Sequence, residues 1–279
     1  MARFEVVVGL FVLMLVAVFA VEDPQLQLSL RSRPGWDVLG VESKLDPDAV
    51  MTLLFYEWNL FGTLDNQEHF RGNYFGPWSI SEDQREVRRE MEDEGMELRA
   101  SLVEDGARLL LTVKNRSPSD WPELASVVPC LSAGNAHIRG APDKGFFDPG
   151  HSHTYFVSLD GLELLRQREI HFNRELIAAL EEYSPDGTFV FSHKWPTSDR
   201  YATAGIMIRE SEDRNWVAAI AWERFLAAQG HNPLKCMHLS VQVGPLKREE
   251  IRQIRGKIYL FQGTKEDCLR RFQNDFGLR

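Results

Sequence analysis

The chain has 279 residues, of which 43% are hydrophobic and 26% are charged, a composition typical of a globular protein. It excludes a disordered, collagen-like or low-complexity chain. The 41 acidic residues outnumber the 32 basic ones and give a net charge of −9. Binding to a phosphate backbone requires a basic surface, so we expect no nucleic-acid partner.

An apolar run at the N-terminus predicts export. Residues 6–21 are apolar apart from Gly9, and they follow a single arginine, Arg3. The run is shorter than the about 20 residues that a membrane-spanning helix needs. It therefore resembles a signal peptide over residues 1–20, with small residues positioned for cleavage after Ala20. We expect a secreted or periplasmic protein with no stable membrane insertion after cleavage; an uncleaved N-terminal anchor is the alternative.

Residues 21–83 predict an N-terminal extension that precedes the main domain. Asp46 and Pro47 are typical of a helix start, so we expect a helix over residues 46–59. Residues 61–78 are rich in aromatic side chains but are interrupted by glycine and proline, which favours a shaped loop.

Alternating apolar and polar residues predict a β-rich domain over residues 84–279. A hairpin is expected where residues 96–103 and 109–113 alternate on either side of a turn at residues 104–106. Residues 216–222 are apolar throughout, as in a strand that is covered on both faces. Further strands are predicted at residues 188–194, 202–209, 236–243 and 251–261, and helices at residues 174–183 and 265–276, capped by Asn173 and Thr264. The expected fold is mainly β: one large antiparallel β-sandwich with a few peripheral helices.

The return strand of this hairpin ends in Leu111-Thr112-Val113-Lys114-Asn115-Arg116-Ser117, and a loop containing proline follows. A strand that ends in Val-x-Asn-x-Ser resembles the galactose mutarotase-like superfamily of large β-sandwiches. This group contains sugar epimerases and has related folds in polysaccharide lyases and glycoside hydrolases. Residues 244–261 are similar to the late turn and strand of the same group. The resemblance implies a mutarotase-like sandwich and a carbohydrate ligand.

The chain departs from that family where its catalytic residues would be expected. In sugar mutarotases, the strand with the Asn-x-Ser motif leads to a histidine that is followed by an aromatic pair. The corresponding residues 124–130 of this chain contain no histidine. No glutamate of this chain lies in a motif that matches the family's late catalytic glutamate. The resemblance therefore implies the fold and not the mutarotase reaction. Residues 229–233, Gln-Gly-His-Asn-Pro, also resemble a family of secreted bacterial proteins to which we attach no activity.

Three histidines are expected to lie together at one end or one face of the sheet. His193 ends a predicted strand, His231 lies in a loop, and His238 lies on the polar side of the strand that this loop enters. Cys236, His238, Ser240 and Gln242 share the polar side of this strand. Such a row of polar side chains is either solvated or the floor of a polar cleft. Because imidazole exchanges protons near neutral pH, these three are candidate catalytic residues; packing histidines are the alternative. Candidate substrate-binding residues are Trp195, whose ring would stack on a sugar, Lys194, Asn232 and Gln229.

Metal binding is the remaining chemistry that the sequence leaves open. His151 and His153 lie on one side of an extended segment and are a weak candidate pair for a divalent metal; a polar loop is the alternative. No cofactor is predicted. An exported protein could pair two of the three cysteines, Cys130, Cys236 and Cys268, or bury all three as small apolar side chains.

These observations favour an exported carbohydrate-active protein that acts on a glycan by histidine-assisted acid–base chemistry, as a lyase, epimerase or hydrolase. Two alternatives stay open. One is a non-catalytic module for sugar binding or interaction with the envelope, and the other is a metal-binding β-sandwich protein. Whether the protein is an enzyme is left undecided by the sequence.

Overall fold

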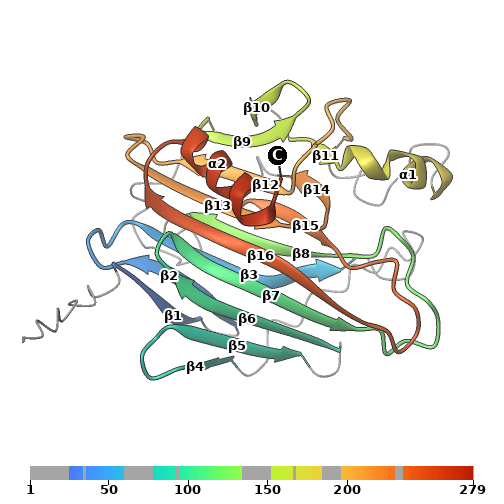
Figure 1. The fold of residues 1–279 in the computed structure, drawn as a ribbon, viewed down its shortest axis with the longest axis horizontal. Helices are drawn as coiled ribbons and strands as arrows, with labels where there is room; N and C mark the ends of the chain where they lie inside the picture. The colour runs from blue at the N-terminus through green and yellow to red at the C-terminus, as the bar shows by residue number, and fades with distance from the viewer. Residues whose placement is uncertain are drawn as a thin grey trace, which may run out of the picture.

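Two antiparallel β-sheets pack face to face around a shared apolar core (Figure 1). The computed structural model describes residues 25–33, 36–59, 78–91, 95–133, 152–165, 168–183, 196–229 and 235–278. The predicted fold class, a large antiparallel β-sandwich with a few peripheral helices, is confirmed.

The seven-stranded sheet, here called sheet A, has the strand order β1-β2-β3-β8-β15-β14-β11. It joins strands from both ends of the described chain, because β3 and β15 both pair with β8. Its strands are β1 (Leu26–Arg33), β2 (Trp36–Ser43), β3 (Val50–Asn59), β8 (Ser126–Ala133), β15 (His238–Gln242), β14 (Phe225–Gln229) and β11 (Ile170–Phe172).

The nine-stranded sheet, here called sheet B, has the order β10-β9-β12-β13-β16-β7-β6-β5-β4. The hairpin predicted from alternation is its β6–β7 pair. Its strands are β10 (Gly161–Leu164), β9 (Thr154–Ser158), β12 (Ile206–Glu210), β13 (Trp216–Trp222), β16 (Ile251–Gln262), β7 (Gly106–Lys114), β6 (Met96–Val103), β5 (Glu86–Met91) and β4 (Trp78–Ile80).

Strand β13 is covered on both faces, as its continuous apolar sequence predicts. Ala218 and Ile220 pack in the core between the sheets. Val217 and Ala219 pack on the opposite side, in a cluster that includes Phe272 of helix α2 (Lys265–Phe276). Figure 1 shows α2 lying across this face of sheet B.

Both predicted helices are present with the predicted caps. In α2, the Thr264 side chain accepts a hydrogen bond from the Asp267 N–H, and the Asp267 carboxylate accepts one from the Thr264 N–H. The Asn173 side chain accepts from the Glu175 N–H at the start of a 3₁₀ turn (Arg174–Leu176), and α1 (Ile177–Tyr183) continues from it. No helix in the described part of the chain is long and apolar enough to cross a membrane.

The helix predicted over residues 46–59 is wrong, since most of this segment forms β3. Asp46 accepts a hydrogen bond from the Asp48 N–H at 2.9 Å, so it closes a turn instead of capping a helix. Met51 and Leu53 then alternate into the core between the sheets. Burial of these side chains outweighs the local helix-start signal. Strand β3 also lies in the same sheet as β8, while the predicted boundary between residues 21–83 and 84–279 stays a prediction.

Two other predicted strands are shorter than expected. The strand predicted at residues 202–209 begins only at Ile206, and the one at residues 236–243 spans only β15. The strand at residues 188–194, the signal peptide and the loop over residues 61–77 lie outside the described residues.

A buried network of charges attaches α2 to sheet B. Lys257 of β16 is 5% exposed, and its Nζ lies 2.7 Å from both Asp105 Oδ1 and Asp275 Oδ2. Arg271 of α2 donates to Asp105 Oδ2 at 2.9 Å. Removing one partner leaves other buried charges incompletely paired, so such networks are sensitive to substitution.

Asp105→Asn is expected to lower the free energy of unfolding by about 2 kcal/mol, because the amide cannot compensate the charge of Lys257 or Arg271. Urea unfolding of the two proteins measures the difference. Glu104→Gln is the matched control, since Glu104 is exposed and adjacent; it should change stability by less than about 0.5 kcal/mol. Equal effects of the two substitutions would show that the network does not stabilise the fold.

Candidate functional site

The side chains of β15 alternate between the core and the outer face of sheet A. Met237 and Leu239 pack in the core between the sheets. His238 and Ser240 lie on the opposite face, yet they are only 2% and 1% exposed. The polar side of this strand is therefore buried. It is not the solvated surface that the sequence left open as one alternative.

Neighbouring strands extend this polar surface. Ser126 of β8 pairs with Gln242 of β15, and Gln229 of β14 pairs with His238. Among the described residues, Gln229 Oε1, Ser240 Oγ and Ser126 Oγ are buried without a hydrogen-bond partner. A buried polar atom without a partner costs about 1–3 kcal/mol. Such atoms are ordinarily satisfied by ordered water or by a bound ligand.

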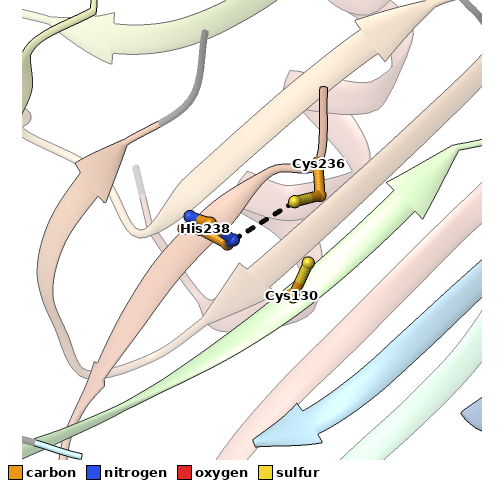
Figure 2. A group of neighbouring side chains, drawn as sticks. All are labelled: Cys130, Cys236 and His238. Carbon is orange, nitrogen blue, oxygen red and sulfur yellow. Dashed lines mark hydrogen bonds between the residues drawn. The ribbon is translucent and has the colours of Figure 1, made fainter. Parts of the chain in front are cut away.

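Two cysteines lie beside His238 on this face. Cys236 lies two residues before the start of β15, and Cys130 lies on β8. Figure 2 shows the three side chains directed toward one another, with Cys236 Sγ 3.3 Å from His238 Nε2. The two sulfur atoms and a ring nitrogen of His238 all lie within 4.8 Å of one another. No disulfide joins Cys130, Cys236 and Cys268, which are all described and all buried.

A carboxylate from a third strand completes the group. Glu57 Oε2 lies 2.9 Å from His238 Nε2. Strand β3 pairs with β8 at Leu54, opposite Cys130, and the register shifts between Leu54 and Trp58. Glu57 lies within this irregular stretch, and irregularities of this kind change the direction in which a side chain points. The cluster is thus assembled by β3, β8 and β15.

The cluster has strongly perturbed electrostatics. Burial raises the pKa of the Cys130 thiol well above its usual range, and Cys236 and Glu57 raise it further. Burial alone would lower the pKa of His238. The adjacent Cys236 sulfur and Glu57 carboxylate stabilise the protonated ring and raise this pKa to about 10. The cluster therefore favours the protonated form of the His238 ring beside Glu57.

Among the predicted site residues, the structure describes His238, Gln229 and His153. His238 and Gln229 lie side by side on adjacent strands, as a common site requires. His153 lies immediately before β9, in sheet B. The other candidates, His193, His231, Lys194, Trp195, Asn232 and His151, lie outside the described residues.

Pro196 and Gln229 border two of the segments that lie outside the described residues, and both lie close to His238 in sheet A. The Ile170 N–H donates to the carbonyl oxygen of Pro196 at 3.0 Å. Ile170 pairs with Gln229, and Gln229 pairs with His238. Pro196 and Gln229 therefore lie at the same end of sheet A as His238.

Sequence reasoning missed Cys130 and Glu57 as neighbours of His238. Cys236 and His238 share one strand face, and this signal was readable from their spacing. The partners come from β8 and β3, and only the strand order of sheet A brings them together. Long-range strand pairing has no local signature in the sequence, so it could not have been found there.

His171 occupies a separate cleft at the edge of the sandwich. The cleft has a volume of about 540 Å³, and its lining includes Tyr155, Glu163 and Arg200. His171 Nδ1 lies 2.8 Å from the carbonyl oxygen of Arg200, and the ring stacks on Phe156 with centroids 3.9 Å apart. His171 is therefore a buried imidazole with a hydrogen-bond partner at Nδ1.

His171 should make stability depend on pH. Burial lowers its pKa, although the Arg200 carbonyl and the charges of Glu169 and Glu163 oppose this effect. His171 therefore binds a proton more tightly in the unfolded chain than in the folded protein. The free energy of unfolding is highest above about pH 6.5, and it decreases as the pH falls from there toward the lower pKa of the folded state.

Replacing His171 by Phe keeps a ring against Phe156 but removes the titration. Denaturant unfolding at several values between about pH 5 and about pH 8 should show a smaller pH slope for His171→Phe than for the unsubstituted protein. The difference can reach at most about 1.4 kcal/mol per pH unit for one proton. Identical slopes would contradict this role of His171.

No protein-family model matches the chain. No curated protein matches it either. Solved structures similar to it include a candidate aldose 1-epimerase from Escherichia coli K12, with 8% identity, a TM-score of 0.42, and coverage of 85% of this chain and 100% of that one.

A galactose mutarotase-like protein from Lactobacillus casei has 11% identity and a TM-score of 0.39 over 84% of this chain and 100% of its own. A polysaccharide lyase has 10% identity and a TM-score of 0.42, over 86% of this chain and 33% of the lyase. Mutarotase-like proteins, which the sequence motifs resemble, thus appear among the similar solved structures.

Proposed function

We propose that the protein is an exported carbohydrate-binding protein that holds its ligand on the outer face of sheet A, around Gln229 and Ser240. One observation supports this above others. Gln229 Oε1 and Ser240 Oγ are buried and have no hydrogen-bond partner among the described residues. A sugar hydroxyl both donates and accepts hydrogen bonds, so a polyhydroxylated ligand suits a row of such atoms.

The sequence supplies a second line of support. In the sequence, Lys194 and Trp195 directly precede Pro196, and Asn232 follows Gln229 by three residues; Pro196 and Gln229 both contact Ile170 of β11. An aromatic ring gives a flat apolar face for the apolar side of a sugar, and amide and ammonium groups contact its hydroxyls. Sugar binding at this face does not require acid–base catalysis. The acid–base role that the sequence predicts for His193, His231 and His238 stays a prediction, as does a lyase, epimerase or hydrolase activity.

Ser240→Ala separates a ligand site from a structural one. If a ligand normally satisfies Ser240 Oγ, the ligand-free variant should be as stable as the original protein or more stable by up to about 1 kcal/mol, because it buries no unpaired hydroxyl. Sugar affinity should fall about tenfold, which corresponds to about 1.4 kcal/mol. Binding to a panel of mono- and oligosaccharides and urea unfolding measure the two effects.

The matched control is Ser101→Ala on β6 of sheet B, which should leave sugar affinity unchanged. Gln229→Met should behave as Ser240→Ala does, since it removes the amide while keeping the length of the side chain. If both variants lose stability by about 1–3 kcal/mol with no effect on any sugar, these groups have partners within the folded protein. That result would refute the proposed site.

Export is proposed from the leader-like residues 1–20. N-terminal sequencing of the protein isolated from its native host should begin at or near Val21, because the small residues before it permit cleavage after Ala20. Replacing residues in the middle of the apolar run with charged ones should retain the chain in the cytosol. Recovery of an intact chain that starts at Met1 in the soluble cytosol would contradict export.

A further inference from the structure

Three metal-ligating atoms converge on one point of the outer face of sheet A. The Sγ atoms of Cys130 and Cys236 and a ring nitrogen of His238 lie within 4.8 Å of one another (Figure 2). Zinc binds thiolate sulfur at about 2.3 Å and imidazole nitrogen at about 2.0–2.1 Å, so tetrahedral ligands lie roughly 3.4–3.8 Å apart. Cys236 Sγ and His238 Nε2, at 3.3 Å, are already close to that separation. Small side-chain adjustments would bring Cys130 to the same spacing.

A fourth ligand is available from β3. Glu57 Oε2 lies 2.9 Å from His238 Nε2, the same ring nitrogen that lies 3.3 Å from Cys236 Sγ, so its carboxylate borders the cluster. Carboxylate oxygen is a regular ligand of zinc beside cysteine and histidine. Rotation of this side chain toward the sulfur atoms would give a four-ligand set of two thiolates, one imidazole and one carboxylate.

The surroundings of the cluster suit a metal ion. Cys130 and Cys236 pack in a small apolar cluster with Val38 and Leu54, which shields the sulfur atoms from water. The ligands lie on or next to paired strands of sheet A, and a rigid scaffold of this kind holds ligands in fixed positions. Two sulfur donors and an imidazole select zinc and related transition metals over magnesium or calcium.

We propose that Cys130, Cys236, His238 and Glu57 bind one divalent transition-metal ion of the zinc type. Binding replaces protons by the ion, because the two thiols and the imidazole lose theirs to solvent. The site is distinct from the sugar contacts of the proposed function, since neither Gln229 nor Ser240 supplies a ligand. It is also distinct from the histidine pair that the sequence suggests for a metal.

Cobalt is the probe for this site. The full chain, prepared without an affinity tag, reduced and kept under nitrogen, is titrated with Co²⁺. We expect one equivalent to bind and to produce both the near-ultraviolet band of thiolate-to-cobalt charge transfer and the visible bands of tetrahedral cobalt. One equivalent of zinc should then abolish these bands. Zinc should also raise the melting temperature, because an ion that binds only the folded state stabilises it.

Substitutions identify the ligands. Cys130→Ser and Cys236→Ser should each weaken cobalt binding more than tenfold and, at saturating cobalt, remove about half of the charge-transfer band, since one of the two thiolates is lost. Glu57→Gln should weaken it about 10- to 100-fold with the sulfur band retained. Cys268→Ser is the matched control, since Cys268 is equally buried but packs between α2 and sheet B; it should bind as the original protein does. Ser240→Ala should also retain the metal, whatever its effect on sugars.

Two results would overturn the metal site. The first is that the reduced original protein binds no stoichiometric cobalt, a measurement that does not depend on the folding of any variant. The second is that Cys130→Ser and Cys236→Ser, shown by circular dichroism to be folded, bind cobalt as tightly as Cys268→Ser. A loss of sugar binding in Ser240→Ala with intact cobalt binding would instead support both sites independently.

Discussion

The packing of sheet A against sheet B is the constraint on which the rest of the structure depends. Side chains alternate along a strand, so each strand that gives its apolar residues to the shared core must turn the residues between them outward. In β15 this places Met237 and Leu239 inside, and His238 and Ser240 outside. The packing of the core therefore determines which side chains lie on the outer face. A shift of the strand by one residue would turn its apolar side chains outward, so the register is fixed.

What distinguishes this outer face is that its polar groups are buried. An exposed polar face needs no partners, whereas buried hydroxyl, amide, thiol and imidazole groups each require one. The cluster around His238 meets this requirement with charge, because the Glu57 carboxylate lies 2.9 Å from the ring. The adjacent Gln229 and Ser240 do not meet it within the described residues. The second observation is the one that supports the sugar contacts proposed at Gln229 and Ser240.

Much of the fold could be predicted from the sequence, because its determinants are local. The β6–β7 hairpin, strand β13 and helix α2 with its Thr264 cap each follow from patterns within a dozen or so residues. The helix predicted at Asp46 and Pro47 was wrong for a physical reason: the start signal was local, but the burial of Met51 and Leu53 against distant strands decides the structure. The polar face of β15 was likewise predictable, whereas its burial was not.

The residues of the cluster around His238 were likewise only partly predictable from local sequence patterns. The Cys236 and His238 spacing puts both side chains on one face, which the sequence indicates directly. Their partners Cys130 and Glu57 depend on the order β3-β8-β15, which only tertiary structure supplies.

The central claim is the proposal that this cluster on the outer face of sheet A binds a metal ion. Anomalous X-ray scattering from crystals of the tag-free protein, grown after loading with zinc, tests it most directly. We predict an anomalous peak about 2.0–2.3 Å from Cys130 Sγ, Cys236 Sγ and His238 Nε2. A bond of about 2.05 Å between the two sulfur atoms, or closely packed side chains with no anomalous peak among them, would contradict the claim.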